Sequence, residues 1–131
     1  CALPILETSL LVFQCPYGRM PSNHTIYLCV SGQDCCFHES TPKSISNITD
    51  GTSNTLIVVE VPRDRTVPWM SPIDADESLI LELSDASELT HVGRIHAGLA
   101  DGSVRFIDVN TDRSTLKAVL TISGGEVVGE F

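Results

Sequence analysis

Residues 95–128 read IHAGLADGSVRFIDVNTDRSTLKAVLTISGGEVV, and this stretch holds the clearest local signals of the fold. Asp101-Gly102 has the composition of a tight hairpin turn, because glycine accepts the positive backbone angles that such turns demand. Apolar and polar side chains alternate in the SVRFIDV segment that follows, residues 103–109, and this period of two predicts a strand. The stretch therefore begins with a turn that opens a strand.

A helix is expected directly after this strand. Thr111 or Asp112 can accept hydrogen bonds from the free amides of its first turn, and Gly124-Gly125 is a stop signal at its end. Between these points apolar residues recur at helical spacing, namely Leu116, Val119 and Leu120. Residues 126–131 then predict a short closing strand or tail.

Three further strands are expected upstream, at residues 9–14 (SLLVFQ), 25–30 (TIYLCV) and 55–61 (TLIVVEV). The last is apolar almost throughout, which predicts burial on both faces until Glu60. Residues 31–49 are polar and predict a long loop, whereas 78–83 (SLILEL) fit either a strand or a helical turn. The fold class expected is therefore α+β, a small antiparallel β-sheet with one C-terminal helix.

Size and charge limit the classes of function. A chain of 131 residues with 42 % hydrophobic residues is long enough for one domain with its own core, which we expect over residues 1–131. Its net charge of -9 repels phosphate backbones and anionic headgroups, so nucleic acid is not an expected partner. No stretch approaches the roughly 20 apolar residues of a membrane-spanning helix. We therefore expect no membrane insertion by this chain.

All cysteines fall in the first 36 residues, at Cys1, Cys15, Cys29, Cys35 and Cys36. In an exported protein this density predicts disulfides with one thiol left over, in a pairing that the sequence leaves open. Reduced structural thiols are the alternative. A zinc site among these cysteines is disfavoured, because the pairs lack the usual two-residue spacing. Cys1 opens the chain without an initiator methionine, which predicts removal of an upstream segment and is also compatible with a lipoprotein terminus.

The ITDGTSNT segment, residues 48–55, predicts a structured turn. Asp50 and Asn54 can satisfy local backbone amides, while Gly51 allows the positive φ that the turn needs. We interpret the segment as structural, with a binding surface as the alternative. Asn23 and Asn47 stand in glycosylation triplets, which makes both possible acceptors.

His96 is the main candidate for acid–base chemistry. A general base needs a nucleophile or an orienting carboxylate within hydrogen-bond reach, and a triad of Asp50, Ser53 and His96 is one arrangement. Ser53 does not stand in the strained Gly-x-Ser-x-Gly turn that exposes a serine nucleophile. We favour a structural role, in which His96 bonds the backbone around the turn at Asp101 and Gly102, and no catalytic residue is assigned.

Two further features suggest ligands. Asp108, Asn110 and Asp112 have the spacing of the first oxygen ligands of a calcium loop, although Arg113 stands where an EF-hand has glycine. They predict a calcium site, and the other interpretation is a strand followed by a capped helix. Trp69 can stack on a sugar ring or cover the edge of the core.

Three segments carry a family resemblance: residues 95–128 with His96, Asp101 and Gly102, NITDGTSNTLIVVE (47–60) and VPWMSP (67–72). They resemble a large planctomycete family of unknown function that is also classed as solute-binding. Its members begin with a prepilin-type cleavage and methylation segment. The match covers the C-terminal half of such proteins, with residues 48–131 as the family-like core and 1–36 as a cysteine-rich part. The family's histidine usually stands farther from the Asp-Gly pair than His96 does, which puts a shared role for His96 in doubt.

The resemblance implies a pseudopilin-like domain that lacks its N-terminal helix. Its expected function is that of a non-enzymatic structural or interaction subunit in an exported, pilin-like surface or filament assembly. Its partners would then be other protein subunits, and its location would be extracytoplasmic. One alternative is a surface module that binds a small solute or carbohydrate in a pocket lined by Trp69 and His96. A hydrolase that uses His96 is the other.

Overall fold

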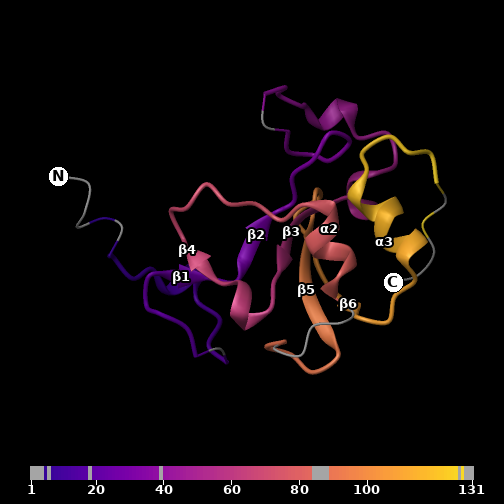
Figure 1. Ribbon diagram of the computed structural model, residues 1–131. Helices are drawn as coiled ribbons and strands as arrows, with labels where there is room; N and C mark the ends of the chain where they lie inside the picture. The colour runs from indigo at the N-terminus through magenta and orange to yellow at the C-terminus, as the bar shows by residue number, and fades with distance from the viewer. Residues whose placement is uncertain are drawn as a thin grey trace.

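The computed structural model describes residues 5, 7–17, 19–38, 40–83, 89–126 and 128. Their fold is α+β, as predicted, with two antiparallel sheets, short helices and several 3-10 turns (Figure 1). In Figure 1 the helices α2 and α3 lie together beside the main sheet, and a two-stranded ribbon lies apart from them. None of the helices in the described residues is long and apolar enough to cross a bilayer.

The main sheet has four strands in the order β2-β3-β5-β6, and every neighbouring pair is antiparallel. Their bounds are Tyr27–Cys29, Leu56–Glu60, Arg94–Leu99 and Val104–Asp108. The strands expected at 25–30, 55–61 and 103–109 are confirmed, although the first is divided between two sheets. Gly102 has a φ of 85° in the turn between β5 and β6, which confirms the hairpin. The strand β5 has no counterpart in the sequence-based prediction.

The small ribbon pairs β1 (His24–Thr25) with β4 (Val67–Pro68). The 3-10 helices are η1 (Leu11–Phe13), η2 (Ile45–Asn47), η3 (Thr52–Asn54) and η4 (Arg63–Arg65). The strand expected at residues 9–14 is wrong, because η1 occupies its centre. Leu11 is 82 % exposed, so this apolar run has no buried face to support pairing in a sheet.

Two α-helices pack against each other, α2 (Glu77–Leu81) and α3 (Arg113–Leu120). Residues 78–83, which fitted either structure, are largely helical. Asp112 caps α3 by accepting a hydrogen bond from the Ser114 amide, as predicted. The helix ends before Gly124, because Thr121 already has an extended backbone with ψ 152°. Residues 127 and 129–131 of the expected closing strand lie outside the described residues.

The two faces of the main sheet differ in what covers them. One face packs into the core with the helices, through buried residues that include Leu28, Val59, Ala97, Ile107, Leu116 and Val119. Because side chains alternate along a strand, the strand residues that stand between these buried ones point to the opposite face, called the second face below. The sequence predicts that burial of this strand ends at Glu60. In the structure Glu60 lies on the second face and is itself buried, with 1 % exposure.

Candidate functional site

A row of four side chains crosses the second face of the main sheet. Tyr27 of β2 pairs with Glu60 of β3, and His96 of β5 pairs with Phe106 of β6. Glu60 and His96 join the two halves of the row through a side-chain contact of 2.7 Å. The row therefore follows directly from the register of the four strands.

Glu60 accepts two hydrogen bonds from one residue. The paired residues of β3 and β5 end at Val59 and Ala97, so the His96 amide next to them lacks a strand partner. The Glu60 carboxylate takes that place, and its Oε2 atom accepts the bond from the His96 backbone nitrogen at 2.9 Å. The same Oε2 lies 2.7 Å from His96 Nδ1. A buried side chain thus continues the ladder where the backbone pairing stops.

The predicted contact between His96 and the backbone of the Asp101-Gly102 turn is wrong. Alternation along β5 directs the imidazole across the sheet toward Glu60, away from that turn. Asp101 closes the turn with its own carboxylate, which accepts bonds from the Ser103 amide at 2.8 Å and hydroxyl at 2.6 Å. These bonds lower the pKa of Asp101.

Cys15 and His91 approach Glu60 from two other segments. Nε2 of His91 lies 3.7 Å from Oε1 of Glu60. One ligand atom from each of Cys15, Glu60 and His91 lies within 4.8 Å of the other two. Cys15 is 4 % exposed, which leaves its sulfur little access to a substrate as a nucleophile. The three side chains are better arranged to share a small ion.

Tyr27 completes this cluster at the β2 end. Burial, followed by the negative charges of Cys15 and Glu60, raises the pKa of Tyr27 to about 12, and a hydrogen bond with Cys15 contributes in the same direction. The Tyr27 phenol therefore keeps its proton beside the Cys15 sulfur.

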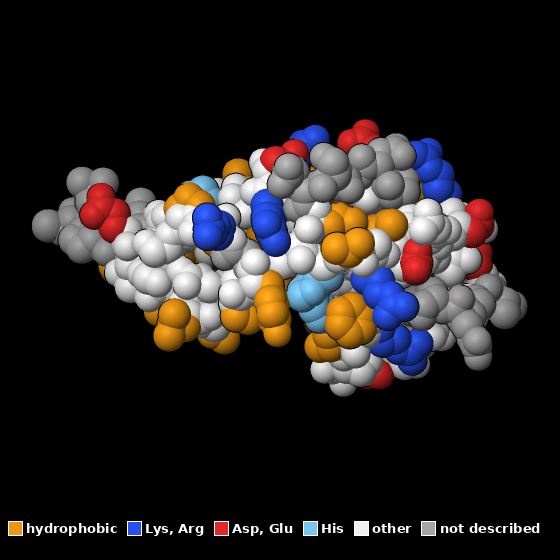
Figure 2. All heavy atoms as spheres, turned by 90° about the horizontal axis from the view of Figure 1, so that it is seen from below, with side chains coloured by type: hydrophobic (Ala, Val, Ile, Leu, Met, Phe, Trp, Pro, Cys, Tyr) orange, Lys and Arg blue, Asp and Glu red, His pale blue; other side chains and the backbone are white. Residues whose placement is uncertain are grey.

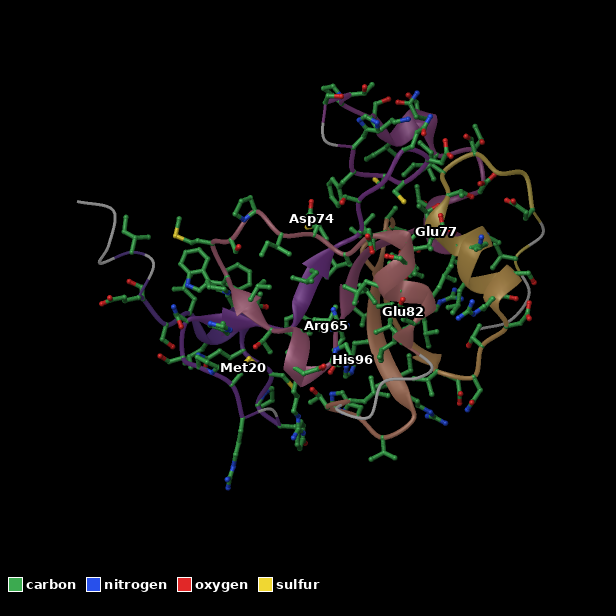
Figure 3. All side chains as sticks on the ribbon, viewed as in Figure 1. Met20, Arg65, Asp74, Glu77, Glu82 and His96 are labelled. Atoms are coloured by element: carbon green, nitrogen blue, oxygen red, sulfur yellow. The ribbon has the colours of Figure 1, made fainter. Side chains whose placement is uncertain are left out.

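Aromatic rings form the solvent-facing border of the cluster. The His91 ring lies 5.8 Å from Tyr17, 4.5 Å from His96 and 6.3 Å from Phe106, measured between centroids. His96 and Phe106 are 4.3 Å apart. Figure 2 shows histidine side chains at the surface directly beside hydrophobic and basic ones. In Figure 3, His96 lies in the main sheet, well separated from Glu77 at the start of α2.

The ITDGTSNT segment holds the C-terminal part of the chain. Asp50 accepts bonds from the amides of Gly124 at 2.7 Å and Gly125 at 3.0 Å, so the expectation that it satisfies local amides is wrong. Asn54 also differs, because its side chain donates to the Asp50 carbonyl at 3.2 Å. Gly51 has a φ of 96°, as predicted. The Asp50 carboxylate therefore ties the segment after α3 to this turn.

The triad of Asp50, Ser53 and His96 is not assembled. Asp50 is engaged by the glycine amides, and the imidazole of His96 is engaged by Glu60. Ser53 is exposed on η3. Asp50 and His96 therefore have separate structural partners.

The carboxylates of the predicted calcium site accept local hydrogen bonds. Asp108 accepts from the amide and side chain of Asn110 at 2.9 Å and 3.0 Å. Asp112 accepts from the Ser114 amide and hydroxyl. These bonds lower the pKa of both carboxyl groups. The arrangement fits the alternative of a strand followed by a capped helix, and calcium binding stays a prediction.

The described cysteines do not form the expected disulfides, since Cys15, Cys29, Cys35 and Cys36 are all free. Cys15 is buried at the second face beside Tyr27, whereas Cys29 is exposed on β2, so their thiols occupy different environments. Cys1 lies outside the described residues.

The asparagines of the two glycosylation triplets and Trp69 also contact neighbouring residues. Asn47 accepts a bond from the Ser44 amide at 2.7 Å, and the Asn23 carbonyl accepts one from the Trp69 amide at 2.9 Å. Trp69 stacks on Phe13 with centroids 5.5 Å apart and donates to the Thr8 carbonyl at 2.8 Å. Trp69 thus packs on the N-terminal segment, and among the described residues it does not belong to the core cluster. Glycosylation stays a prediction.

One polar hollow lies elsewhere, near α3. It encloses about 390 Å³, and the residues that line it are Gly32, Gln33, Asp34, Cys35, Glu77, Lys117, Leu120, Thr121 and Glu126. Neither Trp69 nor His96 lines this hollow, so it is not the pocket that the solute-binding alternative requires.

Sequence reasoning missed Cys15, Glu60 and His91 as a group. The one available signal was Glu60, an acidic residue near the end of an otherwise apolar strand.

No protein-family model matches the chain, and no curated protein or solved structure matches it either.

Proposed function

We propose that this chain is a non-enzymatic subunit of an extracytoplasmic, pilin-like assembly, and that it associates with further copies of itself through strand β6. The observation that carries the proposal is the outer edge of β6, the last strand of the main sheet. Strand edges are templates for pairing with another chain, and two-fold homodimers are the commonest assemblies. The sequence resemblance to pilin-like proteins supports the location and the kind of assembly.

The backbone of β6 supports pairing at this edge. The Leu99 amide donates to the Ser103 carbonyl, and the Val109 amide donates to the Gly93 carbonyl. In an antiparallel pair such bonded positions alternate with unbonded ones, so the amides and carbonyls of Val104 and Phe106 point away from β5. An antiparallel copy of β6 can accept and donate to these groups.

Exposed apolar side chains support the same surface. Val104 is 66 % exposed and Phe106 is 50 % exposed on the second face. Aromatic residues are enriched at the centres of protein interfaces. In a two-fold pairing centred on Phe106, this ring packs against its copy and covers the border beside His96.

Sedimentation velocity over a range of protein concentrations tests the proposal. The chain is expected to dimerise, and Val104→Lys is expected to make it monomeric by adding a charge at the edge. Ile45→Lys is the matched control, because Ile45 is 73 % exposed on η2 and should leave association unchanged. A chain that stays monomeric at every concentration, or equal loss of association in both variants, would refute the proposal.

A further inference from the structure

Glu60 carries a buried carboxylate oxygen that lacks a hydrogen-bond partner. The side chain of Glu60 is 2 % exposed, and its Oε1 atom has no donor in the described part of the chain. The other oxygen, Oε2, already accepts both bonds from His96. Leaving a buried charged oxygen without a hydrogen bond is costly, so this atom is available to a further positively charged partner.

Two side chains that can bind a metal lie close to the Glu60 carboxylate. His91 Nε2 lies 3.7 Å from its Oε1 atom, and Cys15 Sγ belongs to the same group within 4.8 Å. Zinc bonds of about 2.0–2.3 Å at tetrahedral angles separate neighbouring ligands by roughly 3.3–3.7 Å. The 3.7 Å between His91 Nε2 and Glu60 Oε1 falls within this range.

We propose that Cys15, Glu60 and His91 bind one divalent transition-metal ion of the zinc class, and that His96 positions the Glu60 carboxylate for it. A thiolate and an imidazole select zinc-like ions over calcium and magnesium, which prefer oxygen ligands. Three protein ligands leave one coordination position for water or for a further donor.

Neighbouring side chains support the ligands. His96 fixes Oε2 with two bonds and thereby directs Oε1 toward His91 and Cys15. The phenol of Tyr27 lies beside Cys15 at the β2 end of the row. Such outer contacts orient metal ligands and tune their affinity. The ion would join three segments far apart in the sequence, which is a common means of stabilising a small domain.

Cobalt absorption spectroscopy on the chelator-treated chain tests the thiolate ligand. One cobalt ion per chain is expected, with a thiolate-to-cobalt charge-transfer band in the near ultraviolet. The Cys15→Ser variant should lose that band, whereas Cys29→Ser, which changes an exposed thiol on β2, should keep it. Absence of the band in the unchanged chain, or its persistence in Cys15→Ser, would overturn the assignment.

Zinc titration by calorimetry tests the other ligands. Glu60→Gln keeps an acceptor for His96 but loses the anionic ligand, and His91→Gln loses the imidazole. Both should abolish binding in chains whose circular dichroism is unchanged. His38→Gln is the control for His91, since His38 accepts local amide bonds in its own loop.

The positioning role of His96 has a separate readout. His96→Gln should weaken zinc binding by about 10- to 100-fold and keep the cobalt charge-transfer band, because the thiolate ligand stays in place. Unchanged zinc affinity in this variant would remove His96 from the proposal. Unchanged affinity in Glu60→Gln or His91→Gln would refute the site itself.

Discussion

The Glu60 carboxylate and His96 are joined twice, because Oε2 lies 2.9 Å from the backbone nitrogen and 2.7 Å from Nδ1 of the same residue. One bond replaces a missing strand partner, and the other fixes the direction of the imidazole. The pair therefore links the end of the β3–β5 ladder to the row of side chains on the second face.

Glu60→Ala should lower the free energy of unfolding by roughly 2–3 kcal/mol, since it leaves the partly buried His96 amide without an acceptor. Glu60→Gln retains an acceptor and should cost about 1 kcal/mol. Urea denaturation measures both, with the exposed Glu82→Ala as a control that should stay within about 0.5 kcal/mol. Equal effects of Glu60→Ala and Glu82→Ala would contradict the structural role of this carboxylate.

Local signals predicted β3, β6 and α3, because their periodicity and caps lie within a few neighbouring residues. The strand β5 was missed, since Ala97 and Gly98 have low strand propensity and interrupt its apolar alternation. Its identity comes from pairing on both sides, with β3 and with β6. The opposite error occurred at η1, where an apolar run remains exposed.

The candidate site was beyond local reasoning. A shift of one residue in a strand's register moves its side chains to the other face of the sheet, so the row from Tyr27 to Phe106 depends on register throughout. Cys15 and His91 reach Glu60 from segments with no shared motif. His96 was identified as important from its motif, but its partner was assigned to the nearby turn instead of the neighbouring strand.

The stabilising contribution of Tyr27 should be lost in alkali. Its pKa is raised from 10.0 to about 12, so the folded chain retains the phenolic proton where the unfolded chain loses it. The contribution of Tyr27 is complete below pH 10 and is lost as the pH rises toward about 12. Urea denaturation across this window should show a steeper decline for the unchanged chain than for Tyr27→Phe. Parallel curves would contradict the expectation.

Asp50→Ala should release the segment after α3. The substitution removes the acceptor of the Gly124 and Gly125 amides, and charged hydrogen bonds contribute about 1.5–3 kcal/mol each. Hydrogen exchange followed by mass spectrometry should show faster exchange in residues 121–126. Asp64→Ala is the control, because the side chain of Asp64 is 60 % exposed and contacts only its neighbour Arg65 at 3.9 Å among the described ion pairs. Unchanged exchange in Asp50→Ala would show that other contacts hold the segment.

Gly102→Ala should destabilise the β5–β6 hairpin through backbone strain alone. Gly102 has a φ of 85°, and an added Cβ would meet no atom within 4 Å, so the cost is that of a left-handed backbone, about 1–2 kcal/mol.

Gly98→Ala is the matched control within the same hairpin. Its added Cβ would lie 3.6 Å from Val58 Cβ, an ordinary contact, and its backbone needs no positive φ. The free energy of unfolding in urea should fall for Gly102→Ala and stay within about 0.5 kcal/mol for Gly98→Ala. If both variants lost the same stability, the strained turn would not be the cause. Gly102→Asn should recover part of the loss, because asparagine tolerates this conformation better than alanine does.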